Sequence, residues 1–168
     1  YMKFMKNEES SIKTVDFFND SEIKIDLEKE LNLEKNKYDT IILFNTLEHI
    51  YNYKFLLSGI NKILKEKGKF EIFVPFLIGY HPDPNDFFRP THKYLKDILN
   101  ECGFDGEVHL IGVGPFITSY NMIFRYLKFS ILKLFFFIIF IALDKLLSFF
   151  SKDWLIYYCG THVSAYKK

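Results

Sequence analysis

The chain has 168 residues, of which 49% are hydrophobic and 26% charged, and its formal net charge is +1. This length suits one compact domain with a core of its own and is too short for two of ordinary size. The composition is that of a globular protein, and a net charge so close to zero gives no electrostatic basis for binding nucleic acid. We therefore expect a single domain over residues 1–168 and no nucleic-acid partner.

The first elements in the chain are two short candidate strands, residues 11–15 and 22–25, which end at Asp16 and Asp26. A carboxylate that follows a strand beside a nucleotide site can accept hydrogen bonds from ribose hydroxyls. An Asp in this position is also a good turn former. From the residues alone, the turn-forming interpretation is favoured for both.

The most informative stretch is residues 38–50, YDTIILFNTLEHI. Its apolar run is typical of a strand that helices cover on both faces, as in parallel sheets, and the carboxyl ends of such strands hold ligands. Asn45 and Thr46 stand at this end, followed by Glu48 and His49. Glu48 and His49 can orient a ligand, transfer a proton or bind a divalent metal; alternatively, His49 packs on the next helix and Glu48 is solvated.

Alternating helices and strands are predicted downstream. The pattern gives a helix over 53–66 that stops at Gly68, a strand over 69–76, a helix over 91–100 and a strand over 107–113. Strands that alternate with helices of this length indicate βαβ units and an α/β fold.

The loop between residues 79 and 90 and the residues just after it concentrate groups that can carry chemistry: His81, Asp83, Asp86, Arg89 and His92. Loops that a rigid sheet positions often carry function. The alternative is a surface loop held by an Asp86–Arg89 pair, with two phenylalanines anchored in the core.

An apolar helical segment is predicted over residues 119–150, with ten consecutive apolar residues from 134 to 143. A bilayer span needs about 20 apolar residues, and Lys133, Asp144 and Lys145 are costly inside a membrane. A helix that is buried or lies on a membrane surface through residues 131–150 is therefore favoured over a span. Residues 157–166 alternate and predict an edge-type strand.

Several of these segments resemble the class I S-adenosylmethionine-dependent methyltransferases of the methyltransferase-11 type. The matching pieces are VDFF at 15–18, KIDLEKEL at 24–31, YDTIILFNTLEHI, and INKILKEKGKFEIFVPF at 60–76. The loop HPDPNDFFRPT and the ending GTHVSAYKK resemble a subgroup often encoded among cell-surface polysaccharide genes.

The resemblance implies a Rossmann-like, doubly wound and mostly parallel sheet, with the long apolar helix before the last strand. It also implies S-adenosyl-L-methionine as the cofactor. By position, Asp16 would hold the ribose hydroxyls, Asp26 and Leu27 would sit by the adenine, and the methionine side would be lined by Phe44, Asn45 and Thr46. The family's first strand and glycine-rich loop are absent from these residues, and the chain begins with Tyr1 rather than Met. We therefore expect a fragment that is truncated at its N-terminus.

The implied activity is methyl transfer to a small-molecule, glycan or lipid-linked acceptor, in the cytoplasm and at the inner face of a membrane. His81 is the first candidate for the base and His49 the second, with Asp86 and Arg89 as substrate-binding residues. No metal is expected, because Asn45 replaces the first Glu of the Glu-x-x-Glu-His turn that holds metal in some relatives.

Two other functions compete with methyl transfer. One is an inactive, truncated module that binds a membrane or a partner. The other is a nicotinamide-dependent oxidoreductase, which requires a G-x-G-x-x-G run that this sequence lacks. Cys102 and Cys159 are interpreted as thiols of a reducing compartment, and no pattern indicates the oligomeric state.

Overall fold

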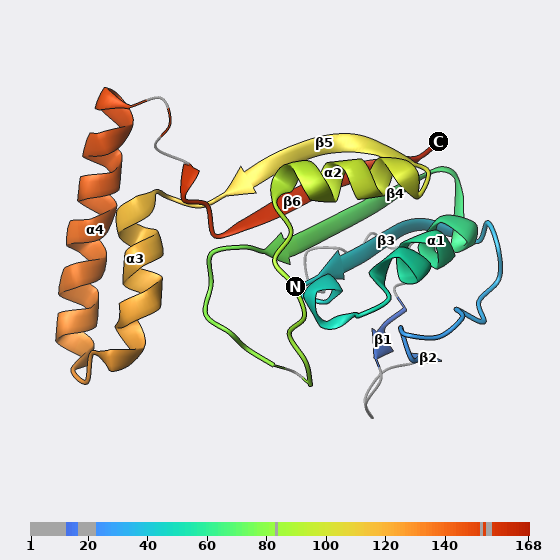
Figure 1. The fold of residues 1–168 in the computed structure, drawn as a ribbon, viewed down its shortest axis with the longest axis horizontal. Coiled ribbons are helices and arrows are strands. Elements are labelled where there is room, and N and C mark those ends of the chain that lie inside the picture. The colour runs from blue at the N-terminus through green and yellow to red at the C-terminus, as the bar shows by residue number, and fades with distance from the viewer. Residues whose placement is uncertain (1–12, 17–22, 83, 152, 154–155) are drawn as a thin grey trace, which may run out of the picture.

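A computed structural model describes residues 13–16, 23–82, 84–151, 153 and 156–168. Strands and helices alternate between residues 38 and 111, as Figure 1 shows. The strands are β1 (Val15–Asp16), β2 (Ile23–Lys24), β3 (Tyr38–Phe44), β4 (Leu64–Pro75), β5 (Phe104–Ile111) and β6 (Gly160–Lys167). The α-helices are α1 (Tyr53–Ile63), α2 (His92–Glu101), α3 (Pro115–Ile123) and α4 (Ser130–Phe150). The predicted α/β class is confirmed.

The main sheet has the strand order β3-β4-β6-β5. Strands β3, β4 and β5 run in one direction, while β6 lies between β4 and β5 and runs antiparallel to both. Three of the four strands therefore agree in direction, yet two of the three pairings are antiparallel. The prediction of a mostly parallel sheet holds for strand direction and is wrong for pairing.

The last strand was expected at an edge and is instead interior, paired on both sides from Gly160 to Tyr166. Its alternation has another cause. Val163 and Ala165 point into the core, whereas His162 and Ser164 are only half-buried on the opposite face of the sheet. Alternation here reports a sheet with one uncovered face, not a strand with one free edge.

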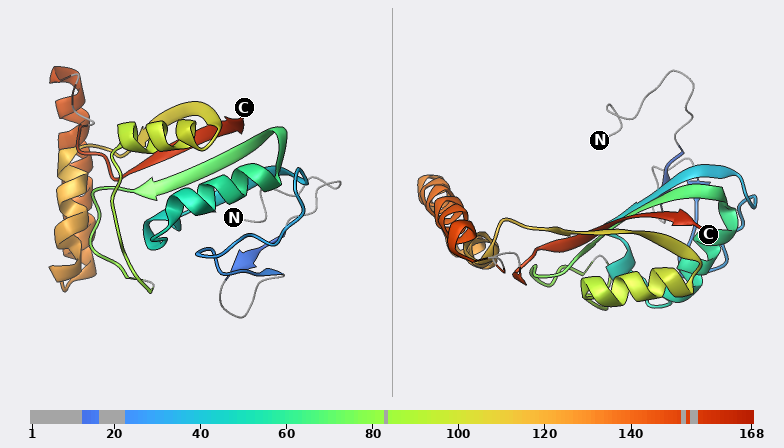
Figure 2. Two further views of the ribbon diagram at one scale, coloured as in Figure 1. Left: turned by 45° about the vertical axis from the view of Figure 1, so that its right-hand side comes forward. Right: turned by 90° about the horizontal axis from the view of Figure 1, so that it is seen from above.

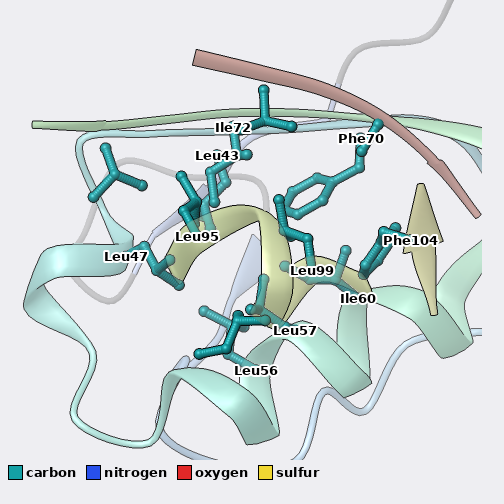
Figure 3. Close-up of a cluster of buried hydrophobic side chains, with 14 of the residues drawn as sticks. Leu43, Leu47, Leu56, Leu57, Ile60, Phe70, Ile72, Leu95, Leu99 and Phe104 are labelled. Atoms are coloured by element: carbon teal, nitrogen blue, oxygen red, sulfur yellow. The ribbon is translucent and has the colours of Figure 1, made fainter. Parts of the chain in front are cut away.

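Helices α1 and α2 pack on the same face of the sheet, as both views in Figure 2 show. Figure 3 shows the resulting core, in which side chains from the strands meet side chains from both helices. The central residues are Leu43, Phe70, Ile72, Leu56, Leu57, Ile60, Leu95, Leu99 and Phe104. Burying each such side chain contributes roughly 1.5–3 kcal/mol, so this face of the sheet supplies the main apolar stabilisation.

The opposite face of the sheet has no helix over it in the described part of the chain. Ile42 is 41% exposed and Phe44 40% exposed on this face. The expectation of helices on both faces is therefore wrong for the described residues. The physical reason is that the segment between β2 and β3, residues 25–37, forms turns and no helix.

Several element boundaries differ from the sequence prediction, and two of the differences have a clear physical reason. Helix α1 ends at Ile63 rather than at residue 66, because Leu64 is fully buried and already pairs with Tyr38 of β3. Lys67 takes the left-handed turn conformation (φ 59°) in place of the glycine after it. Strand β5 begins three residues early because Phe104 is fully buried against Phe70, with ring centroids 5.1 Å apart.

The two N-terminal strands, β1 and β2, pair with each other in parallel and form a sheet separate from the main one within the described residues. Both short strands predicted from the sequence are present, although residues 11, 12 and 22 of those predictions lie outside the described residues. A division into two sheets is what the predicted absence of the family's first strand leads us to expect.

Helices α3 and α4 form a hairpin inserted between β5 and β6, in place of the single segment predicted over 119–150. The first helix starts at Pro115, a residue suited to the first helical position. Figures 1 and 2 show the two helices side by side and standing apart from the sheet. None of the helices in the described part of the chain is long and apolar enough to cross a bilayer.

Candidate functional site

The candidate site lies where β3 and β4 end, at the edge of the sheet to which their arrows point in Figure 1. After β3 the chain turns at Asn45, whose φ of 49° is left-handed, and a short 3-10 helix follows over Leu47–His49. Asparagine tolerates this conformation better than most residues. After β4 the loop of residues 76–91 returns over the same edge and brings His81 to the 3-10 helix.

Glu48, His49 and His81 form a close cluster, with one potential ligand atom from each lying within 4.8 Å of the others. The Oε1 atom of Glu48 is 3.7 Å from Nε2 of His49 and 3.7 Å from Nε2 of His81. The two imidazole rings meet edge to face at a centroid distance of 5.3 Å. The sequence placed the first two residues together, and the fold adds the third from the next strand end.

Glu48 is fully buried, and among the described residues no other residue forms a hydrogen bond with its carboxylate. Burial raises the pKa of this carboxyl, and its own backbone N–H together with the charges of His49, Arg89 and His81 offset the rise only in part. An unpaired carboxylate in such a place is costly. The solvated Glu48 of the alternative interpretation is therefore wrong.

The contact with the backbone of Asn85 determines which ring nitrogen of His49 carries the proton. Its Nδ1 atom contacts the backbone oxygen of Asn85, and because a carbonyl only accepts, Nδ1 must carry the proton. In the neutral ring, Nε2 then has a lone pair that faces Glu48 Oε1. Two acceptors face each other unless a proton lies between them, which agrees with the raised pKa of Glu48.

His81 is held by Asp86 and Arg89. Its backbone N–H donates to Asp86 Oδ2 at 3.0 Å, and Arg89 Nη2 lies 3.1 Å from its Nδ1. Burial alone would raise the pKa of Asp86, but the Arg89 guanidinium and the His81 backbone N–H outweigh it and keep this pKa below its ordinary value. Gly79 O also lies 3.1 Å from Nδ1 of His81, so this nitrogen either accepts from Arg89 or donates to Gly79.

The predicted substrate-binding residues therefore bind each other: Asp86 and Arg89 form an ion pair across three positions. Arg89 Nε is buried and has no hydrogen-bond partner, so one donor of the guanidinium is uncommitted. Of the two phenylalanines between them, Phe88 packs against the core while Phe87 is 45% exposed. A cleft of about 570 Å³ opens beside this loop, lined mainly by Tyr51, Tyr53, Phe87, Phe88, Arg89 and Tyr94.

The predicted cofactor residues fall into two groups. Phe44, Asn45 and Thr46 lie at the end of β3, where the first two are exposed and Thr46 Oγ1 donates to Phe44 O at 3.0 Å. Asp16 ends β1 and so lies on the separate two-stranded sheet. The structure thus brings the β3 group to the histidine cluster and leaves Asp16 on another sheet.

Asp26 and Leu27 precede the polar loop between β2 and β3. The Asp26 carboxylate accepts from Glu28 N at 3.0 Å and pairs with Lys29 at 3.0 Å. The hydrogen bond from Lys29 is the main cause that lowers the Asp26 pKa. This is the turn-forming arrangement that the sequence favoured, while the side chain of Leu27 packs against the core.

Sequence reasoning missed two groups that position the site. The Glu28 carboxylate accepts from Tyr51 N at 2.6 Å and from Asn52 N at 3.1 Å, and so ties the Asp26 loop to the start of α1. The backbone oxygen of Asn85 fixes His49. No sequence signal marks either one, because a backbone carbonyl has no residue type and an exposed Glu is common.

One carboxylate and two imidazoles are also a suitable donor set for a divalent metal. The described cluster of Glu48, His49 and His81 has the required proximity. The expectation that the chain binds no metal stays a prediction.

The chain matches one protein family in sequence and several solved structures in fold. Residues 5–72 match the family described as the methyltransferase domain. Among solved structures, the chain is similar to the 1,6-didemethyltoxoflavin-N1-methyltransferase of Burkholderia thailandensis, with a TM-score of 0.56, 12% identity, and coverage of 92% of this chain and 60% of that one. It is also similar to an S-adenosylmethionine-dependent methyltransferase from Mesorhizobium loti, with a TM-score of 0.52, 15% identity and coverage of 89% and 72%.

The chain has the fold of the class I S-adenosylmethionine-dependent methyltransferases. The resemblance found in the sequence is confirmed. A third similar structure, the [4+2]-cyclase SpnF, has a TM-score of 0.53, 11% identity and coverage of 86% of this chain and 55% of that one. This protein is a cyclase by name, so the fold alone does not fix a reaction.

The chain spans 55% to 72% of the length of these three structures. No curated protein matches it. Within the methyltransferase fold, the exposed Phe44 and Asn45 at the end of β3 are accessible to a cofactor and fit its apolar and polar parts. Asp26 fits less well, since both Lys29 and a backbone N–H already occupy its carboxylate.

Proposed function

We propose that this chain carries out S-adenosylmethionine-dependent methyl transfer to a small-molecule, glycan or lipid-linked acceptor. The observation that carries the proposal is the cluster of the buried Glu48 with the partly exposed His49 and His81 at the strand ends of a methyltransferase fold. The cofactor supplies an activated methyl group on a sulfonium. The protein's own residues then have to hold donor and acceptor in line and remove a proton where the acceptor is a hydroxyl.

The residues at the end of β3 bind the cofactor in this proposal. Phe44, Asn45 and Thr46 line its methionine side, and the exposed ring and amide at this turn support that assignment. Asp16 accepts from the ribose hydroxyls, and the polar loop after β2, with Asp26 and Leu27, lies by the adenine. The Glu28 bonds to Tyr51 N and Asn52 N support the last assignment, since they join this loop to the site.

His81 is the base. Its side chain is 33% exposed, whereas that of His49 is 13% exposed and committed to Asn85. His81 takes the acceptor's proton at Nε2, a nitrogen that lies 3.7 Å from Oε1 of Glu48. Asp86 holds His81 in place, and Arg89, which lines the cleft beside this loop, contacts the acceptor.

Substitution of the base tests this assignment. The full chain is supplied with methyl-labelled S-adenosylmethionine and candidate acceptors with free hydroxyls, and cofactor binding is followed by calorimetry. His81→Ala should lower turnover about 10²–10⁴-fold, the usual contribution of a general base, while cofactor affinity is unchanged. His109→Ala, at an exposed position of β5, is the matched control.

The results separate the competing functions. An unchanged turnover in His81→Ala, with cofactor still bound, would remove His81 as the base but keep the methyltransferase. Absence of cofactor binding in the unsubstituted chain would instead favour the inactive, truncated module. The proposed place of action is the cytoplasmic face of a membrane.

A further inference from the structure

The hairpin of α3 and α4, residues 115–150, has an apolar outer surface that the other described residues leave open. Large side chains recur along α4 at helical spacing on this outer side, and several are more than half exposed: Ile131 78%, Leu134 58%, Phe135 55%, Ile138 58%, Leu146 54% and Phe149 77%. We refer to these six residues as the outer stripe. Figures 1 and 2 show α4 with α3 on one side and no part of the sheet on the other.

The inner side of α4 is also apolar. Phe140 contacts Phe116 and Tyr120 of α3, with ring centroids 6.1 Å apart in each case. A surface helix normally presents charged or polar residues on the side away from its neighbour, and a helix that is apolar all round is covered on all sides. An apolar patch that runs along a whole helix marks an interaction site.

The charges of the hairpin are of one sign. The sequence has no Asp or Glu between Glu107 and Asp144. Asp144 itself is fully buried, where it accepts from the backbone N–H groups of Phe116 and Ile117. Arg125 and Lys128, in the turn between the helices, are exposed. The hairpin therefore offers positive charge to its surroundings, and its one acid is already satisfied.

Aromatic side chains flank the basic turn. Tyr126 is 83% exposed and Phe129 67% exposed, next to Arg125 and Lys128. Aromatic rings beside basic residues are the arrangement that anchors protein segments at the boundary between lipid headgroups and acyl chains. Anionic lipids attract such a basic segment by about 1 kcal/mol for each Lys or Arg near the surface.

We propose that the hairpin docks on the surface of a bilayer that contains anionic lipids. The outer stripe enters the boundary between headgroups and acyl chains, and Arg125 and Lys128 contact the headgroups. One consequence rests on the proposed function. The hairpin joins the sheet at the end of β5, at the same edge as the ends of β3 and β4 (Figure 1), so a docked membrane lies on the side of the His81 cluster.

Flotation tests the proposal without any acceptor or cofactor. The full chain is synthesised in a cell-free system with vesicles of phosphatidylcholine alone or with 30% phosphatidylglycerol, and the vesicles are floated on a density gradient. We expect at least a ten-fold larger floating fraction with the anionic vesicles, and a marked loss when 0.5 M salt screens the headgroups.

Two substitutions separate the apolar and the electrostatic parts. Phe135→Glu should abolish flotation, while Phe55→Glu, at a similarly exposed position of α1, should not. Arg125→Glu with Lys128→Glu should reduce binding to the level seen with neutral vesicles, while Lys96→Glu on α2 should not. The residues of the basic turn are exposed, so their variants keep the fold.

Three results would overturn the proposal. Failure to float with either vesicle, with a dimer in sedimentation, would assign the outer stripe to a second copy. Equal flotation with both vesicles would remove the role of anionic lipid. Resistance to extraction at high pH would indicate insertion deeper than the surface. Because none of these readouts involves methyl transfer, they are independent of whether the proposed function holds.

Discussion

Among the residues that the structure describes, two carboxylates are completely buried, Glu48 at the strand ends and Asp144 in the helical hairpin, and their hydrogen bonding is opposite. Asp144 accepts from Phe116 N at 2.9 Å and Ile117 N at 2.8 Å, the first free donors of α3. Among the described residues, no other residue donates a hydrogen bond to the Glu48 carboxylate. A buried acid placed on a helix N-terminus stabilises the fold, whereas a buried acid without a partner opposes it and is a candidate for function.

The same contrast holds for the two regions around these acids. The strand-end cluster keeps titratable groups inside an otherwise apolar core, and the hairpin keeps apolar side chains outside. Each region departs from the rule that apolar groups are buried and charged groups exposed. Departures of this kind concentrate at sites that bind something, which is why both proposals come from these two places.

Removal of the satisfied acid should have the largest effect on stability. Asp144→Ala leaves two helix-terminal N–H groups without their charged acceptor, at a cost of about 3 kcal/mol. Hydrogen exchange at the amides of Phe116 and Ile117 should then be about a hundred-fold faster. Asp153→Ala, at an exposed position after α4, is the control. A change of less than two-fold in Asp144→Ala would show that water replaces the carboxylate at no cost.

Gly114→Ala tests the packing of the Asp144 carboxylate against the start of α3. Gly114 has a φ of +152°, and a Cβ atom at this residue would collide with the Asp144 carboxylate. Strain of this kind costs of order 1–3 kcal/mol, so the unfolding midpoint should fall, whereas Gly79→Ala, with open space around it, should leave it unchanged. The double variant Gly114→Ala/Asp144→Ala should lose less stability than the sum of the losses in the two single variants. Full additivity would mean that the two residues act independently.

The sequence predicts elements well where the signal is local. Helix α2 was expected over 91–100 and lies at His92–Glu101, because the Thr91 side chain accepts from Tyr94 N and Gly103 allows a left-handed turn at its end. Helix α1 was predicted too long, since Leu64 suits a helix by pattern but is drawn into the sheet by its pairing with Tyr38. Which strands become neighbours is a property of the whole sheet, so the interior place of β6 could not be predicted from its own residues.

The candidate site also has a part that local sequence signals predict and a part that depends on the whole fold. Asn45, Glu48 and His49 are close enough in the sequence to be recognised as a group at the end of one strand. His81 follows the next strand, so the convergence of these residues was predictable. The burial of Glu48 was not, because it depends on the loop over residues 76–91 closing above the 3-10 helix. The backbone oxygen of Asn85, which sets the tautomer of His49, carries no sequence signal at all.

The smallest effect, and the most diagnostic, is expected for Glu48→Gln. Burial raises the pKa of Glu48 in the folded protein above that of the unfolded chain. The folded state is therefore favoured by this group at low pH, and that contribution is lost as the pH rises through the folded-state pKa. Glutamine does not ionise, so the variant should match the wild type at pH 4 and be more stable at pH 8, by about 1 kcal/mol.

Unfolding curves in urea at several pH values measure this difference, with Glu30→Gln on the exposed loop as a control that should show no pH trend. A variant less stable than the wild type at pH 8 would reverse the sign, and would mean that a cation stabilises the ionised Glu48. If a chelator then removed the difference, the cation would be a metal held by Glu48, His49 and His81. If it did not, the cation would be a charged group of the protein, and the Arg89 guanidinium, which already lowers the Glu48 pKa, would be the first to test.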